Sequence, residues 1–455
     1  MAFGMARSLQ LWLTLGAFGL APLFFGSVDQ LATAIWVVVL SLGVILGLSI
    51  PLGPRQARLL LVFLVGCGVY AGVAILQIVP NLSDRLADAN WGRANELLGL
   101  QLPARVSARA QIPREAVGHF LLFVAGVLNG FFVGVSRRRT DRLFRVARYV
   151  ILAYAAYGIA ALVVTPNLVL WAPKEAYHGM LTATFINHNT AATFIGAGFI
   201  LWLCRAVLSL KAIEAPSIRF LLLMPWNETF AYRALLLFAA ALLCLFAELL
   251  TSSRGGLICT CLGAFLAMFL LVRKTFDFRL SYGIPAGVLV LGVIAVWLGQ
   301  SGRIGSQGLF DDSRFRVYGA TIDAMLARPV LGYGAGTFAD IFPSVRSDDL
   351  SSWGVWEYAH STLLEIALEM GLPVAVMILA AALGSVVILL RYAQRTKDRS
   401  EGSACAVLGV VALTYLHSLI DFSLQIPGYL IPFSILLGSG LARATAEHGE
   451  SAPAV

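Results

Sequence analysis

Three basic side chains in the second half of the sequence could bind an anion and move a proton. Arg254 lies between two serines and two glycines in Thr251-Ser252-Ser253-Arg254-Gly255-Gly256. Arg314 opens a short polar stretch, and His360 stands directly before apolar residues resume at Thr362. A guanidinium binds phosphate through two parallel hydrogen bonds, and an accessible imidazole exchanges a proton near neutral pH. These residues predict a site where an anionic substrate meets a proton-transferring group.

Arg314 and His360 both fall in the polar segment 299–361, which interrupts an otherwise hydrophobic sequence. A chain that crosses a bilayer many times needs only short turns between its spans. One long loop with arginines, glycines and a histidine is therefore the expected place for chemistry. Within this loop, Asp311-Asp312-Ser313 offers helix-capping side chains and Pro329 ends the segment, which predicts a helix of about four turns.

One face of this predicted helix should dock on the membrane domain, because apolar residues recur on it at helical spacing. Its members are Arg314, Tyr318, Ile322 and Met325. Arg314 ends this stripe and is the better candidate for a buried anion, with Tyr318 beside it. Arg316 projects elsewhere; it is a more peripheral substrate contact or a solvated charge. The alternative for Arg314 is an ion pair with Asp311 or Asp312.

Glycines and two glutamates flank His360. The glycines, at 332, 334 and 336, permit a close backbone approach but lack the Lys-Ser/Thr neighbour of a soluble phosphate loop. Glu365 and Glu369 follow His360 one helical turn apart in an apolar run. A charge near the centre of a spanning helix costs on the order of 3 kcal/mol. Both carboxylates therefore need partners, and arginines are the expected ones.

Two further polar groups are predicted to face the same side of the membrane. Asn187-His188-Asn189 opens an apolar run, and His417 with Asp421 forms an i, i+4 pair near the end of another. Ser252 and Ser253 add hydroxyl donors beside Arg254. The alternatives are purely structural roles. Arg254 would be a snorkelling side chain at the membrane interface, and His417 would form a buried hydrogen bond that ties helices together.

The composition indicates an all-α polytopic integral membrane protein, since 59% of residues are hydrophobic and 13% are charged. About 20 apolar residues cross a bilayer as a helix. Twelve such runs are predicted at residues 9–25, 31–50, 59–79, 117–135, 149–164, 190–207, 234–250, 255–272, 280–298, 362–390, 404–424 and 426–441. This divides the chain into helices 1–9 in 1–299, a periplasmic loop with short helices in 300–361, helices 10–12 in 362–443 and a cytoplasmic tail in 444–455.

Basic residues cluster in alternate connections, and most of the 33 Lys and Arg residues then fall on one side. Because Lys and Arg accumulate on the cytoplasmic side, both termini are predicted there. The long connections 80–116, 165–189 and 299–361 are predicted on the outer face. The net charge of +8 is thus a topology signal, and dispersed basic residues give no support to nucleic-acid binding.

The remaining sequence features argue against other classes. All six cysteines lie in apolar runs, so neither a disulfide framework nor a zinc site is expected. The first apolar run lacks a cleavage site of small residues and is interpreted as an uncleaved anchor. No internal repeat marks the paired halves of a secondary transporter.

Four segments, in this order, resemble the O-antigen ligase and polymerase superfamily of bacterial envelope glycosyltransferases. They are Phe185-Ile186-Asn187-His188-Asn189, Thr251 to Gly256, Ser313-Arg314 through Pro329 to Phe338, and His360 to Gly371. The resemblance covers the chain from Phe185 onward, and Tyr318 stands where the family often has tryptophan. It implies a GT-C-like membrane fold with one large extracytoplasmic helical loop between helices 9 and 10.

The resemblance further implies an O-antigen ligase of the bacterial inner membrane, active on the periplasmic face in lipopolysaccharide biosynthesis. It would transfer glycan from undecaprenyl pyrophosphate to the lipid A-core oligosaccharide with inversion, without metal, nucleotide, other cofactor or obligate protein partner. Arg254 and Arg314 would hold the pyrophosphate and His360 would act on the acceptor hydroxyl. An O-antigen polymerase and a protein O-oligosaccharyltransferase are the enzymatic alternatives. A transporter of lipid-linked glycan is the non-enzymatic alternative.

Overall fold

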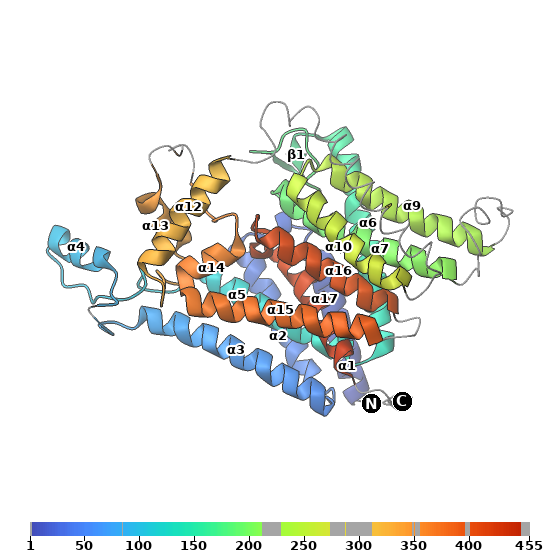
Figure 1. Ribbon diagram of the computed structural model, residues 1–455, viewed down its shortest axis with the longest axis horizontal. Helices are drawn as coiled ribbons and strands as arrows, with labels where there is room; N and C mark the ends of the chain where they lie inside the picture. The colour runs from blue at the N-terminus through green and yellow to red at the C-terminus, as the bar shows by residue number, and fades with distance from the viewer. Residues whose placement is uncertain are drawn as a thin grey trace.

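The computed structural model describes residues 2–83, 85–211, 229–273, 287, 312–347, 350, 355–395 and 401–446. The helices in this part of the chain are α1 (Ala2–Leu20), α2 (Gln30–Gly47), α3 (Pro54–Ile78), α4 (Ala89–Leu98), α5 (Arg114–Gly134), α6 (Arg137–Val164), α7 (His188–Lys211), α9 (Thr229–Leu250), α10 (Arg254–Arg273), α12 (Asp312–Ala327), α13 (Phe338–Val345), α14 (Thr362–Met370), α15 (Leu372–Arg395), α16 (Glu401–Ser418) and α17 (Pro427–Ala444). Two 3-10 turns, η1 (Phe25–Ser27) and η2 (Ser423–Gln425), and a two-stranded sheet of β1 (Leu168–Val169) and β2 (Ala172–Pro173) complete the described elements (Figure 1).

Eight of the described helices are long and apolar enough to cross a membrane, so the chain is a polytopic membrane protein. They are α2, α3, α5, α6, α7, α9, α10 and α15. α1, α16 and α17 form helices at three other predicted spans. The predicted span 280–298, except residue 287, and the first part of the loop after it, residues 299–311, lie outside the described residues, and the count of twelve stays a prediction.

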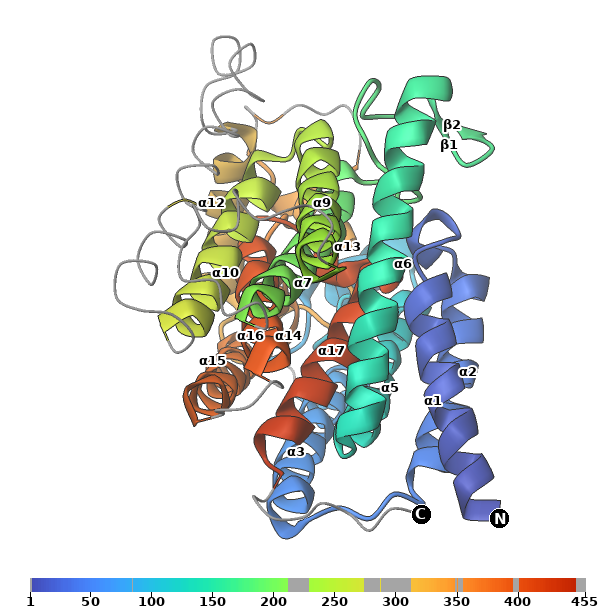
Figure 2. The same cartoon turned by 90° about the vertical axis from the view of Figure 1, so that its right-hand side faces the viewer.

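Two groups of helices form the core (Figures 1 and 2). In one, α5 and α17 pack backbone to backbone: a Cβ at Gly130 would lie 2.1 Å from the Ile435 carbonyl oxygen, and one at Gly438 equally close to the Val127 oxygen. Small residues bring membrane helices together in this way. In the other group, α7, α9, α10 and α16 pack together. The functional candidates lie where the two groups meet.

The bundle has two distinct ends, which we call the base end and the site end. At the base end, Arg7 donates to the Ser49 carbonyl at 3.2 Å and the Gln56 amide donates to the Ala442 carbonyl at 3.0 Å. α3 and α6 begin there, and α17 ends there. The site end lies at the opposite ends of these helices and carries His188, Arg254 and His360.

The predicted span 362–390 is broken, which corrects the sequence analysis. α14 ends at Met370 and α15 begins at Leu372, with Gly371 at φ 82° and ψ 164° between them. This backbone conformation is essentially restricted to glycine. A Cβ at Gly371 would lie 2.2 Å from the Val330 carbonyl oxygen, and the Leu372 amide donates to the Pro329 carbonyl at 2.8 Å. The break therefore admits the 329–336 segment between the two helices.

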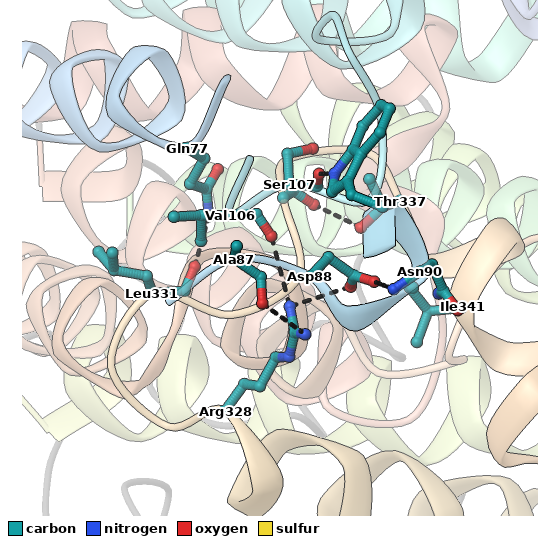
Figure 3. A network of polar contacts seen from close by, with 12 residues as sticks. Gln77, Ala87, Asp88, Asn90, Val106, Ser107, Arg328, Leu331, Thr337 and Ile341 are labelled. Atoms are coloured by element: carbon teal, nitrogen blue, oxygen red, sulfur yellow. Dashed lines mark hydrogen bonds and ion pairs between the residues drawn. The ribbon is translucent and has the colours of Figure 1, made fainter. Parts of the chain in front are cut away.

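Two outer segments, 80–116 and 328–345, are joined by polar contacts (Figure 3). Arg328 forms an ion pair with the buried Asp88 at 2.9 Å, and its guanidinium lies over the Tyr333 ring at 4.6 Å. The Arg109 guanidinium donates two hydrogen bonds to the Asp340 carboxylate, of 2.5 and 2.7 Å. These contacts fix the segment that approaches the break between α14 and α15.

Candidate functional site

The predicted polar groups from three distant segments meet at the site end. Ser253 donates its hydroxyl to the Asn189 side-chain oxygen at 2.7 Å, and the Asn189 amide donates to Asp421 at 2.9 Å. The Ser423 hydroxyl donates to the second Asp421 oxygen at 2.6 Å. Asn187 caps this arrangement by accepting from the Asn189 backbone amide at 2.7 Å. All five residues are buried, so the network holds the first turns of α7 and α10 to the 421–423 segment.

His188 projects from the start of α7 with a defined tautomer. Its Nδ1 lies 2.7 Å from the Thr251 carbonyl oxygen. A carbonyl only accepts hydrogen bonds, so Nδ1 carries the hydrogen and the lone pair of the neutral ring is on Nε2. The ring also packs on Tyr177, with centroids 4.3 Å apart. The sequence analysis did not single out Tyr177; an aromatic residue in a long outer connection was its only signal.

His417 packs inside the bundle, and the predicted i, i+4 spacing does not place it on one helix with Asp421, although the Asp421 carboxylate lies close enough to interact with the imidazole electrostatically. α16 ends at Ser418, so the two residues do not share a helical face. His417 is buried and its Nδ1 lies 2.7 Å from the Thr193 hydroxyl on α7. A Cβ at Gly255 would lie 3.3 Å from its Nε2, so this ring nitrogen faces the first turn of α10. His417 therefore ties α16 to α7 and α10.

Arg254 is the first residue of α10, directly after a connection of three residues, 251–253, that follows α9. Ser252 adopts φ 59° to turn the chain, and Ser253 caps α10 by accepting from the Gly256 amide at 3.2 Å. Arg254 itself is partly exposed. Its guanidinium adds a full charge to a helix N-terminus, where backbone amides already favour anions.

Arg314 lies on the docking face of α12, as predicted. It donates to the Ile420 carbonyl at 3.1 Å. The same face buries Val317, Thr321, Ala324 and Met325. Ile322 does not belong to this face, because 37% of it is exposed, and Arg316 is exposed on another side. The error arose because the buried stripe follows positions three and four apart from Arg314, through Val317 and Thr321.

The electrostatic surroundings of Tyr177 link Arg314 to the Asn189 and Asp421 network. Burial raises the pKa of the Tyr177 phenol, the nearby Asp421 carboxylate raises it further, and Arg314 lowers it. The phenol is therefore neutral at working pH and offers a hydrogen bond beside a cation and two imidazole-bearing segments. Tyr177 belongs to the site on this geometry.

His360 is held by four aromatic or polar neighbours. Its backbone adopts φ 55°, and its ring meets Trp356 and Phe422 edge to face, with centroids 5.2 and 4.9 Å away. Its Nδ1 lies 3.1 Å from the Tyr358 carbonyl oxygen, so the lone pair of the neutral ring is again on Nε2. The Tyr318 hydroxyl donates to the His360 carbonyl at 2.9 Å. A non-glycine residue in this conformation is uncommon and costs energy, as at many functional sites.

Glu365 and Glu369 stabilise backbone rather than pair with the expected arginines. Glu369 accepts from the amides of Gly336 at 2.8 Å and Phe338 at 2.9 Å. Glu365 accepts from the Ala359 amide at 2.7 Å and from the Gln425 side chain. Spacing along the chain does not reveal such partners, because amides in an irregular loop leave no residue-type signal. Glu365 thus holds the residue before His360 and acts as a positioning group.

The short segment from Ile420 to Phe422 touches all three basic candidates or their neighbours. Ile420 accepts from Arg314, and its side chain lies 2.9 Å from where a Cβ on Gly255, next to Arg254, would be. Phe422 packs on His360, and the Asp421 carbonyl accepts from Thr362 at 3.5 Å. The structure therefore brings the predicted residues of four segments to one end of the molecule. Among the described residues, no group of three or more His, Cys, Asp or Glu is placed to hold a metal ion.

Fold and site together define a polytopic membrane protein with two arginines and two oriented imidazoles at one end of its helix bundle. Residues 239–379 match the O-antigen ligase family model, Wzy_C, which supports the resemblance of the chain to the O-antigen ligase and polymerase superfamily. The matched region contains Arg254, Arg314 and His360, whereas Asn187 to Asn189 and Asp421 lie outside it. A comparison with curated proteins found no match.

Proposed function

We propose that the protein is an O-antigen ligase, which transfers O-antigen glycan from undecaprenyl pyrophosphate to the lipid A-core oligosaccharide. The observation that carries this proposal is the meeting of Arg254, Arg314 and His360 around the 420–422 segment, inside or beside the family match. Two guanidiniums suit a pyrophosphate, and one imidazole with its lone pair on Nε2 suits an acceptor hydroxyl. The site would face the periplasm from the inner membrane.

In this proposal, His360 Nε2 takes the proton of the acceptor hydroxyl as its oxygen bonds to the anomeric carbon of the donor. The bond between that carbon and the pyrophosphate oxygen breaks, and undecaprenyl pyrophosphate leaves with the electron pair. Attack opposite the leaving group inverts the anomeric centre. Arg254 and Arg314 would stabilise the charge that develops on the pyrophosphate, and preorganised cations of this kind give large rate effects. These two guanidiniums provide positive charge without a metal.

The Asn189 and Asp421 network would position these groups without touching the reacting atoms. It fixes the first turn of α10, and hence Arg254, against the segment that contacts Arg314. His188 and Tyr177 would contact other parts of the substrate. Ser252 and Arg316 would contact it at the edge of the site. These contacts would orient the sugar and the phosphate. They would not act on the bond that breaks.

The test is transfer by the purified full-length protein from undecaprenyl-pyrophosphate-linked O-antigen to lipid A-core, with both lipids supplied together and singly. The proposal expects a glycan ladder on lipid A-core that requires both substrates. Longer lipid-linked glycan without any transfer to lipid A-core would instead make the protein an O-antigen polymerase. Glycan attached to side chains of an acceptor protein, with none on lipid A-core, would make it a protein O-oligosaccharyltransferase.

A further inference from the structure

A basic cluster, made of Arg145 and Arg148 of α6 and Arg205 of α7, lies away from the site end. Arg148 is followed by residues 149–164, and Arg205 is preceded by residues 188–204; neither stretch contains Lys, Arg, Asp or Glu. At about 1.5 Å per residue, these stretches place both arginines about 25 Å from the site end. The hydrocarbon core of a bilayer is about 30 Å thick. The cluster therefore lies at the boundary between membrane and water on the face opposite the site end.

Trp202 of α7 ties the two helices together at this level. Its indole Nε1 donates to the Arg148 carbonyl at 3.0 Å, and its ring meets the Tyr149 ring edge to face, with centroids 5.2 Å apart. The Arg148 guanidinium lies over the same indole ring, 5.6 Å from its centroid. Trp202 is buried, whereas Tyr149 is exposed. Aromatic residues of this kind are enriched at the level of lipid head groups. They hold the guanidinium in one place beside the membrane surface.

The charges around Arg148 are mostly of its own sign. Its Nε–H is buried and meets no hydrogen-bond acceptor, and no carboxylate in the described part of the chain forms an ion pair with Arg148 or Arg205. Among the charged side chains that act on Arg148, repulsion by Arg205 is the strongest and repulsion by Arg145 comes next. Attraction by Asp141 is the weakest. An anion bound between these guanidiniums would replace their repulsion with attraction.

Arg139, on the same helix, shows how the protein satisfies such a side chain by itself. Its guanidinium donates to the Arg7 carbonyl at 3.1 Å and to the Gln10 side chain. Arg139 and Arg148 are both partly buried, but the Arg148 guanidinium has no comparable acceptor among the described residues. A bound ligand with phosphate oxygens would supply that acceptor, because a guanidinium donates two parallel hydrogen bonds to phosphate.

We propose that Arg145, Arg148 and Arg205 bind the phosphate of an anionic phospholipid, at the membrane face opposite the site end. Three guanidiniums favour a head group with net negative charge, such as phosphatidylglycerol or cardiolipin. Phosphatidylethanolamine is a poorer match, because its amine cancels the charge of its phosphate. The position of the cluster at the end of two apolar stretches favours a lipid over free phosphate. This site is separate from the proposed transfer reaction and does not depend on it.

The two helices of this lipid site both lead to the site end. α6 and α7 pack along each other (Figure 2). α6 runs into the connection that carries Tyr177, and α7 begins at His188. The rings of these two residues pack together, with centroids 4.3 Å apart. A lipid that bridges Arg148 and Arg205 should therefore stabilise the pair of helices that supports this contact.

The experiment titrates the detergent-purified full-length protein with phosphatidylglycerol or phosphatidylethanolamine and counts bound lipids by native mass spectrometry. We expect Arg148→Gln and Arg205→Gln to bind phosphatidylglycerol about tenfold more weakly than the wild type, since each loses a charged donor. The control is Arg142→Gln, an exposed residue of α6 that is not among the charges acting on Arg148; it should bind as the wild type does. Equal weakening in all three variants, or equal binding of the two lipids by the wild type, would overturn the site.

Thermal unfolding and inorganic phosphate separate a lipid site from a general anion site. A ligand that binds the folded state raises the unfolding midpoint, so phosphatidylglycerol should raise it for the wild type and Arg142→Gln. It should not do so for Arg205→Gln, whose exposed side chain can change without loss of packing. Inorganic phosphate should neither raise the midpoint nor displace the lipid. Displacement by phosphate, or an equal rise for Arg205→Gln, would contradict the assignment. Neither measurement uses glycan transfer, so failure of the proposed function would leave both results unchanged.

Discussion

At the residue scale, His188 and His360 share one hydrogen-bond arrangement. Each ring donates from Nδ1 to a backbone carbonyl, at 2.7 Å for His188 and 3.1 Å for His360. This leaves the lone pair of each neutral ring on Nε2, the form that accepts a proton. His360 has the tighter surroundings, since two aromatic rings and the Tyr318 hydroxyl restrain it.

Tyr318 should act through His360. Tyr318→Phe removes the hydrogen bond to the His360 carbonyl but keeps the ring, so we expect a loss of about 1 kcal/mol in stability. We also expect kcat to fall several-fold while KM changes little, because the imidazole is no longer held in place. Steady-state kinetics of glycan transfer measure both. An unchanged kcat would show that the position of His360 does not depend on this bond.

Glu369 should be essential for the fold of the glycine segment. Glu369→Ala leaves the amides of Gly336 and Phe338 without their acceptor, which costs about 1–3 kcal/mol for each buried amide. Glu369→Gln keeps one acceptor oxygen and should lose less. The midpoint of thermal unfolding in detergent compares the two, with Glu357→Ala as an exposed control. Similar midpoints for Glu369→Ala and the control would show that the carboxylate does not support this segment.

At the scale of elements, the break between α14 and α15 is what lets an outer segment enter the bundle. Tyr333 and Gly334 donate backbone amides to the carbonyls of Leu368 and Glu369 at 3.0 and 2.9 Å, at the buried C-terminal end of α14. Helix ends leave carbonyls unpaired, and this segment satisfies two of them. The same contact places the Glu369 carboxylate next to the Gly336 amide. It also fixes the position of α14 relative to His360.

Gly371 should tolerate no side chain. Gly371→Ala places a Cβ 2.2 Å from the Val330 oxygen in a backbone conformation that disfavours other residues, so we expect about 2–5 kcal/mol of destabilisation. Gly68→Ala, which faces open space, should be neutral or slightly stabilising. Thermal unfolding of both variants gives the comparison. Equal stability would mean that α14 and α15 can join as one helix.

The two outer ion pairs should contribute unequally. Asp88 is only 3% exposed against Arg328, whereas Arg109 and Asp340 are 49% and 34% exposed. Removing one partner of a buried pair costs about 3–5 kcal/mol, and an exposed pair contributes at most about 1 kcal/mol. Asp88→Ala should therefore lower the unfolding midpoint far more than Asp340→Ala. The opposite order would show that the Arg109 contact holds the outer segments together.

At the scale of the whole molecule, hydropathy and motif order predicted the class and most helices. The apolar runs at 31–50 and 255–272 correspond closely to α2 and α10, because a membrane requires about 20 apolar residues for each span. The motifs that include Arg254, Arg314 and His360 also fell on the correct side of the bundle relative to one another. The predicted position of each motif follows from its residue types and from its place next to the end of a helix.

Other features depend on contacts that the sequence does not display. Hydropathy continues through Gly371, so the break in the predicted span 362–390 was missed. The partners of Glu369 are loop amides about 30 residues away, and Tyr177 reaches the site through an irregular connection. The cavity of 1540 Å³ lined by α3, α5, α15 and α17 was not predicted either, since a helix that faces lipid and one that faces a cavity have the same apolar composition.

The central claim is that Arg254, Arg314 and His360 form one transfer site. The most direct measurement is the rate of glycan transfer to lipid A-core by Arg254→Ala, Arg314→Ala and His360→Ala, beside Arg93→Ala on the exposed surface of α4. We expect each of the three to lose about a hundredfold or more in kcat/KM, with the fold intact and the Arg93 variant unaffected. Transfer at the wild-type rate by all three variants would contradict the account.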